Sequence, residues 1–431
     1  MNHLFLGIAG ILLAGFVALP TPVVAADNSG ERAPAMRERA FKQLNKAREL
    51  AEAGRLTDAL DELTELRDSR RSNSYERAMA WNLTAFVEYE RDNEQAAAKA
   101  YQQVLAEEGI PSSLRQHTLY ALAQMQMSLS QWQAAAKSME TWFGVTDAPT
   151  TNAFLLLGSA YFQLEDYPRA RKPIERAIAQ ALANDEVPKE NAYLLLRSIY
   201  YAEKDYKRMI GVLKSLCQHY SKREYWVQLA AVYGEQDQTQ QQLATMLAAH
   251  DLGLLETSSD YIILSQLLLG VDVPYRAAKV LSEGVEKGIV ERNARSLRLL
   301  ADAWVLSKEY GEAIAALRSA ATLTGDAELS LRLSQMLYEE GSYQEAVKAA
   351  NQALAAGKLK NGDQAHVIKG LALFELENLS DAQAAFREAA KFDDSRQMAK
   401  QWLAYIDNEQ ERRKALQEIR ERGAAKRASA S

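Results

Sequence analysis

The sequence predicts an all-α solenoid of about ten helix-turn-helix repeats, closed by a C-terminal capping helix. Three features carry this prediction: a packing position that recurs every 33 to 39 residues, a small residue twelve positions before it, and an aromatic or aliphatic residue three positions before it. A period in this range is typical of helical repeat arrays, in which each helix pair buries its apolar face only by stacking on its neighbours. Eight of the ten packing positions are alanine, and the series is Ala59, Ala97, Ala135, Ala170, Met209, Gln242, Ala278, Ala313, Ala346 and Ala382.

The small residue twelve positions earlier is expected to face the packing position across the antiparallel helix pair, where a larger side chain would hold the two backbones apart. It is present in most repeats, as Ala85, Ala123, Gly158, Ala230, Ala301 and Gly370. Around it, the first helix shows an apolar stripe with the 3.6-residue period of an amphipathic helix. In repeat four this stripe is Phe154, Leu157, Gly158 and Tyr161, and in repeat six it is Trp226, Leu229, Ala230 and Tyr233.

These stripes match the W-x2-L-G-x2-Y pattern, so the chain resembles the tetratricopeptide repeat (TPR) family over residues 35–400. The resemblance implies a TPR-type α-α superhelix. Repeats five to seven depart from the pattern, because Met209 and Gln242 replace the alanine while Arg197 and Gln266 replace the small residue. We therefore expect a bend or a break in this middle region. Linkers at 109–112, 147–150 and 187–190 carry prolines, which end one helix and tolerate the first turn of the next.

The first 26 residues differ from the repeats and are predicted to be a signal peptide. Residues 4–19 are all apolar or glycine, Pro20 and Pro22 follow, and residues 23–26 offer small side chains for cleavage. Sixteen apolar residues are short for a membrane span of about 20. An uncleaved inner-membrane anchor is the alternative. Either interpretation predicts that the repeats lie in the periplasm, with membrane contact only through an uncleaved N-terminus or through a partner.

The other end, residues 401–431, is predicted to be a capping helix followed by a charged tail. A run rich in Glu, Arg and Lys extends from Glu409 to Arg427, which is typical of a solvated terminal helix. A basic tail that binds a partner is the alternative interpretation.

Composition and motifs argue against several other functions. The formal net charge is −6, so no broad cationic surface indicates nucleic-acid binding. The five histidines lack the spacing of a zinc site, and the single cysteine, Cys217, lies among leucines as a small apolar residue. No catalytic or nucleotide-binding motif is present. We therefore expect no enzyme activity, no cofactor, no metal and no small-molecule substrate.

In TPR proteins the first helix of each pair lines the concave face, so we expect the binding residues there. In the register above, those positions in repeats two to five are Asn82, Phe86, Tyr89, Tyr120, Gln124, Met127, Leu155, Ser159, Phe162, Leu194, Ser198 and Tyr201. The candidate groove for an extended or helical peptide consists of Asn82, Phe86, Tyr89, Tyr120, Gln124, Met127, Phe162 and Tyr201. Aromatic rings bury area at low entropic cost, and amides can pair with a peptide backbone. The alternative is that packing within the superhelix covers some of these rings.

Three segments, residues 73–106, 222–235 and 266–291, are similar to exported TPR proteins associated with the TonB, ExbB and ExbD systems of gammaproteobacteria. The resemblance implies a periplasmic accessory of TonB energy transduction, which serves the uptake of ferric siderophores or haem. Its expected partner is a protein or peptide segment, with TonB, ExbB and ExbD as the candidates. A TPR scaffold for polysaccharide export or outer-membrane assembly is the alternative.

Overall fold

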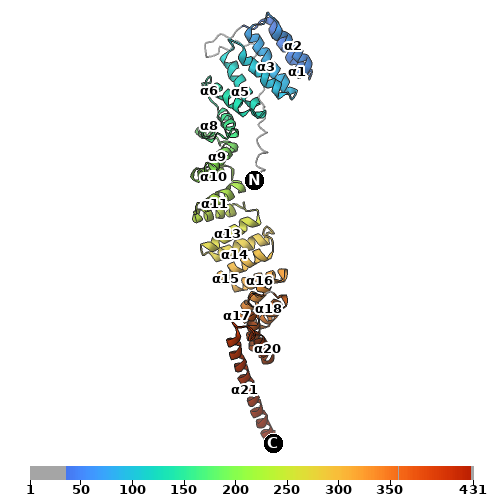
Figure 1. The fold of residues 1–431 in the computed structure, drawn as a ribbon, viewed down its shortest axis with the longest axis vertical. Helices are drawn as coiled ribbons and strands as arrows, with labels where there is room; N and C mark the ends of the chain where they lie inside the picture. Colours follow the sequence, from blue (N-terminus) through green and yellow to red (C-terminus); the bar gives the residue numbers. More distant parts are fainter. Residues whose placement is uncertain (1–34, 358, 429–431) are drawn as a thin grey trace. The chain divides into compact units, whose positions relative to one another are not determined.

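The computed structural model describes residues 35–357 and 359–428, and the predicted signal peptide lies outside them. Within these ranges the chain forms 21 α-helices, so the prediction of an all-α fold built from sequential helix pairs with a long C-terminal helix is confirmed. Figure 1 shows the pairs following one another in chain order within each part.

The chain divides into two compact units between Ser221 and Lys222, within the middle region where the repeat pattern weakens. The N-terminal unit holds repeats one to five: α1 (Glu38–Glu52), α2 (Leu56–Asp68), α3 (Ser74–Glu90), α4 (Glu94–Ala106), α5 (Ser112–Ser128), α6 (Trp132–Phe143), α7 (Thr151–Gln163), α8 (Tyr167–Ala183), α9 (Glu190–Ala202) and α10 (Tyr206–Tyr220).

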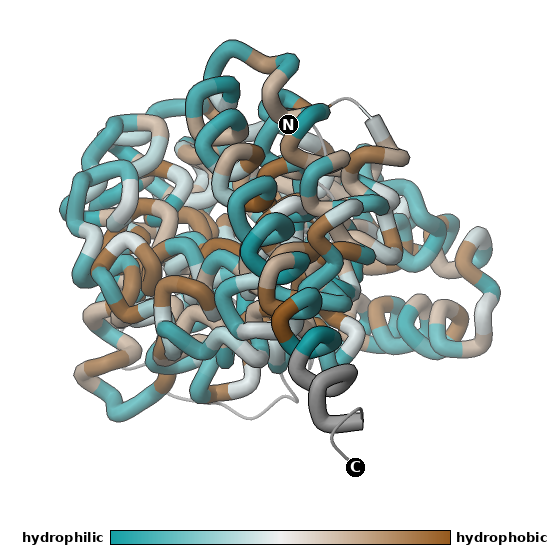
Figure 2. Tube along the Cα trace, turned by 90° about the horizontal axis from the view of Figure 1, so that it is seen from below, coloured by the Kyte–Doolittle hydropathy of each residue, from teal (hydrophilic) through white to brown (hydrophobic). Residues whose placement is uncertain are grey.

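The C-terminal unit holds repeats six to ten and the final helix. These are α11 (Arg223–Glu235), α12 (Thr239–Asp251), α13 (Ser258–Gly270), α14 (Pro274–Glu286), α15 (Ala294–Leu306), α16 (Tyr310–Thr324), α17 (Ala327–Glu339), α18 (Tyr343–Ala356), α19 (Gly362–Glu375), α20 (Leu379–Ala389) and α21 (Arg396–Ala428). Figure 2 shows hydrophobic and hydrophilic residues interspersed along the helices, as expected where a helix has one apolar face.

The turn inside every repeat has one backbone conformation. Five residues before the packing position the chain adopts a left-handed conformation, with φ between 55° and 88°. The next residue donates its backbone N–H to the carbonyl five residues back at 2.7 to 3.0 Å, as in a Schellman motif. The left-handed residues are Gly54, Asp92, Ser130, Glu165, Lys204, Asp237, Asp272, Lys308, Gly341 and Glu377.

Glycine at a left-handed turn position is expected to stabilise the array, because a side chain there meets the following carbonyl. Lys308→Gly should raise the free energy of unfolding by about 1 kcal/mol, measured by chemical denaturation. Gly341→Ala, at the equivalent position of the next repeat, should lower it by a similar amount. Equal effects of the two substitutions in the same direction would contradict the assignment of this turn.

The small packing residues lie where the register predicts. All eight alanines of the series are fully buried, as are Ala85, Ala123 and Ala301 opposite them. Glycine is needed twice, because an added Cβ at Gly158 would overlap Cγ1 of Ile174, and one at Gly370 would lie 2.9 Å from the ring of Phe386. Close approach of the paired helices therefore depends on side-chain size at these positions.

The predicted register of repeat seven is wrong by one residue. The buried pair is Ser265 and Ala277, whose Oγ and carbonyl oxygen are 3.0 Å apart in a hydrogen bond, whereas Gln266 is exposed. Asp272, the left-handed residue, lies five positions before Ala277. Repeat seven thus keeps both small residues of the pattern, and Ala278 is buried beside the packing position.

Repeat six has a large residue at the packing position and a glycine on the helix opposite it. Gln242 occupies the packing position, and the helix opposite carries Gly234, where an added Cβ would lie 2.7 Å from the Gln242 side-chain amide nitrogen. The equivalent of Gly234 in repeats two and four is Tyr89 or Phe162. In repeat five, Met209 is itself buried at the packing position.

Two buried carboxylates join successive repeats. Glu76, at the start of α3, accepts hydrogen bonds at 2.9 Å from the backbone N–H and Nε of Arg37, which precedes α1, and one at 3.0 Å from the Asn73 N–H. Burial alone would raise the pKa of Glu76, but these donors hold it down at about 2. Asp260, at the start of α13, is held in the same way by Arg223 of α11 at 2.7 and 2.8 Å.

Candidate protein-binding face

The predicted binding residues lie on the first helices of the N-terminal unit. Asn82, Phe86 and Tyr89 are on α3, and Tyr120, Gln124 and Met127 are on α5; all six are partly buried. Phe162 on α7 is also partly buried, whereas Tyr201 on α9 is 58% exposed. Access to the face therefore differs from repeat to repeat.

Packing between repeats covers part of the rings in repeat two. Phe86 packs against the core formed by α1, α2 and α3. Tyr89 packs against Ala97 and Ala98 of its own pair and against Leu122 and Met125 of the next. These two rings contribute to the stacking of repeats, and only their remaining surface is open to a ligand.

The rings of repeats three and four are held by neighbouring aromatic side chains. The ring centroids of Tyr120 and Trp142 are 5.7 Å apart, and burial raises the pKa of the Tyr120 hydroxyl. The ring centroids of Phe162 and Tyr167 are 5.9 Å apart. Leu155, which the register placed on this face, is buried at 6% exposure, because the start of α7 packs into the core.

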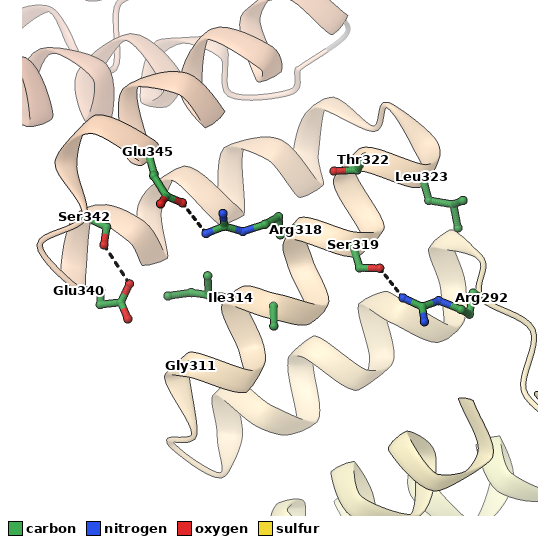
Figure 3. Close-up of a pocket in the computed structure, with 11 residues that line it drawn as sticks. Arg292, Gly311, Ile314, Arg318, Ser319, Thr322, Leu323, Glu340, Ser342 and Glu345 are labelled. Carbon is green, nitrogen blue, oxygen red and sulfur yellow. Dashed lines mark hydrogen bonds and ion pairs between the residues drawn. The ribbon is translucent and has the colours of Figure 1, made fainter. Parts of the chain in front are cut away.

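A separate hollow lies along α16 in the C-terminal unit, which is the second helix of its pair. Its volume is about 740 Å³. Figure 3 shows its sides formed by Arg318, which pairs with Glu345 of α18 at 2.5 Å, and by Arg292, which donates to Ser319 Oγ at 2.8 Å. Leu323, at one end, is 57% exposed.

Sequence reasoning missed this hollow because it considered only first helices. The available signal was a row of small residues, Gly311, Ala315 and Ser319, at four-residue spacing on α16. Such a row leaves space on one side of a helix. The lining combines apolar side chains such as Ile314 with Arg292 and Arg318, which are both paired with neighbouring side chains.

The described residues include potential metal ligands and the chain's one cysteine. In that part of the chain no group of three or more His, Cys, Asp or Glu side chains is placed to hold a metal ion. Burial raises the pKa of Cys217 to about 12, so this thiol is not a nucleophile at neutral pH. Among helices in the described ranges, none combines the length and apolarity needed to cross a membrane.

A family model described as "Tetratricopeptide repeat" matches four segments that together exceed half of the chain: residues 44–112, 120–186, 274–328 and 331–397. The matched segments leave out residues 187–273, which contain the atypical repeats five and six. No curated protein sequence matches the chain at a significant level.

Several solved structures are similar to the chain at low identity. A tetratricopeptide repeat protein from Parabacteroides merdae ATCC 43184 is 14% identical and covers 62% of this chain and 99% of its own, with a TM-score of 0.35. A chain of the structure of Naa15/Naa10 bound to HypK-THB is 14% identical and covers 85% of this chain and 60% of its own, with a TM-score of 0.43. The protein MamA is 18% identical and covers 37% of this chain and 89% of its own, with a TM-score of 0.32.

Proposed function

Because the chain belongs to the tetratricopeptide repeat family, and is therefore a protein-binding scaffold, we propose that it is a non-enzymatic periplasmic accessory of the TonB–ExbB–ExbD system. In this role it grips a segment of one component and supports the uptake of ferric siderophores or haem. Protein binding is supported by the ten successive helix pairs. Within each unit they present a continuous series of first-helix faces.

The finer assignment is supported by the sequence. The apolar segment at residues 4–19 favours export, and residues 73–106, 222–235 and 266–291 are similar to exported TPR proteins of TonB systems. The first-helix face of repeats two to five supplies the grip, with half-covered rings on α3, α5 and α7 and an open ring at Tyr201. Rings of this kind bind extended or helical segments through large, rigid contact areas.

Deletion of the gene tests the physiological role. Cells supplied with iron only as a ferric siderophore are expected to grow and take up iron more slowly without the protein, and to recover on complementation. Growth with free ferrous iron is the control, because it does not need an outer-membrane receptor. Normal siderophore uptake in the deletion strain, without a paralogue, would contradict the assignment to TonB.

Photo-crosslinking in cells tests the binding face. A photoreactive residue at Tyr201 is expected to capture a component of the TonB system, and the weaker exposure of Phe86, Tyr120 and Phe162 should give weaker capture. Leu182 on α8 is the matched control, since it is 49% exposed in the same unit but lies on a second helix. Capture from Leu182 and none from Tyr201 would show that the face is assigned wrongly.

A further inference from the structure

The final helix, α21, carries a row of residues at alternating spacings of four and three along one face. This spacing is the a/d pattern of a coiled coil, in which a helix presents a seam to a second helix. The seam consists of Met398, Trp402, Tyr405, Glu409, Arg412, Leu416 and Ile419. Four of its apolar residues are exposed, Met398 by 39%, Tyr405 by 56%, Leu416 by 43% and Ile419 by 65%.

The face of the same helix that adjoins the seam holds α21 to the last repeat. Ala399 and Ile406 are fully buried there. Two seam residues also contact the last repeat with part of their surface: the Trp402 ring stacks on Phe386 of α20 with centroids 5.5 Å apart, and the Tyr405 ring centroid lies 5.6 Å from that of Phe374 of α19. Arg413 forms an ion pair at 3.6 Å with Glu377, which lies in the turn between α19 and α20. Residues 414–422 are exposed, so the seam continues along a helix that stands clear of the repeats in its own unit.

We propose that this seam binds a second copy of the chain as an antiparallel helix pair, with its twofold axis between Glu409 and Arg412. In that register Glu409 of each copy faces Arg412 of the other. Tyr405 faces Leu416, and Trp402 faces Ile419, so an aromatic residue meets an aliphatic one on both sides of the axis. The contact is isologous, as a closed dimer requires.

The charges select this orientation. In a parallel pair Glu409 would face Glu409 and Arg412 would face Arg412, and like charges at central positions disfavour association. Within one chain Arg412 already contacts Glu409 at 2.7 Å. In the antiparallel pair the two ion pairs combine into one network of four groups across the axis. The inference is independent of the TonB proposal, since it concerns neither the binding face nor its partner.

Sedimentation of the full chain from about 1 to about 100 µM, the range in which weak dimers form, tests the inference. The natural chain is expected to pass from monomer to dimer. Glu409→Arg and Arg412→Glu should each remain monomeric, because each places like charges across the axis. Mixing the two variants should restore a dimer, and so should the double exchange Glu409→Arg/Arg412→Glu.

Lys414→Glu is the matched control, since it reverses a charge on the same turn but off the seam, and it should leave association unchanged. Circular dichroism of each variant checks that α21 remains helical. A natural chain that stays monomeric at 100 µM would overturn the inference. Association that Glu409→Arg does not weaken, or that the mixture of variants does not restore, would also overturn it.

Discussion

Replacement of Gly158 with leucine is expected to lower the free energy of unfolding of the N-terminal unit by about 3 kcal/mol. An added Cβ at this position would overlap Cγ1 of Ile174 and lie 3.3 Å from the carbonyl oxygen of Ala170. The side chain could be accommodated only if α7 and α8 moved apart. Because the next repeat stacks on this pair, the separation would also loosen its contacts.

Gly211→Leu provides the control for this substitution. Gly211 lies within α10 of the same unit, but an added Cβ there meets no atom within 4 Å. Leucine should therefore stabilise slightly, through its higher helix propensity. Ile174→Ala should recover part of the loss when combined with Gly158→Leu, measured as a double-mutant cycle in urea. Equal effects of Gly158→Leu and Gly211→Leu would show that close approach of the helices is not required.

Glu76→Gln is expected to destabilise the N-terminal unit by about 3 kcal/mol, because it leaves buried donors facing an amide instead of a carboxylate. The backbone N–H groups of Arg37 and Asn73 both point at the Glu76 oxygens. Glu38→Gln is the control, since Glu38 pairs with Lys42 on the exposed surface, where an ion pair contributes little.

The pH dependence follows from the same carboxylate. The pKa of Glu76 is held at about 2 in the fold, below its ordinary value of 4.5. Its stabilising contribution is therefore fully present above pH 4.5 and is lost as the pH falls towards 2. The difference in unfolding free energy between the natural chain and Glu76→Gln should shrink over this range. A difference that stays constant from pH 6 to pH 3 would contradict the role of the ionised carboxylate.

The sequence was sufficient to predict the fold because the repeat pattern records a local requirement. Alanine at the packing position, and a small residue opposite it, are needed where two helices lie as close as at Ala170 and Gly158. That requirement is visible without knowledge of the neighbouring repeats.

The register of repeat seven was not predictable from that pattern alone. Ala277 and Ala278 are adjacent and both fully buried, and Tyr275 resembled the turn residue of other repeats. The second helix starts at Pro274 instead, two residues after the left-handed Asp272. Repeat six was obscured for another reason: the packing position carries the larger Gln242, and a glycine opposite it, Gly234, leaves room for that side chain.

The exposure of the rings on the candidate face could not be predicted from the sequence. Helical spacing placed Phe86, Tyr89 and Tyr201 on equivalent sides of their helices. How much of each ring remains open depends on the side chains of the next repeat, such as Leu122 and Met125 beside Tyr89. Those contacts join residues more than 30 positions apart, which a pattern within one repeat does not contain.

The order of the helix contacts has a consequence for how the chain is made. In the described part of the chain the substantial contacts join helices no more than two apart in sequence. Contact order is therefore low, and little loop entropy has to be lost before a contact forms. Within each unit, a repeat can complete its packing once the following repeat has been synthesised. Folding can thus proceed from the N-terminus during translation, without waiting for the C-terminal helix.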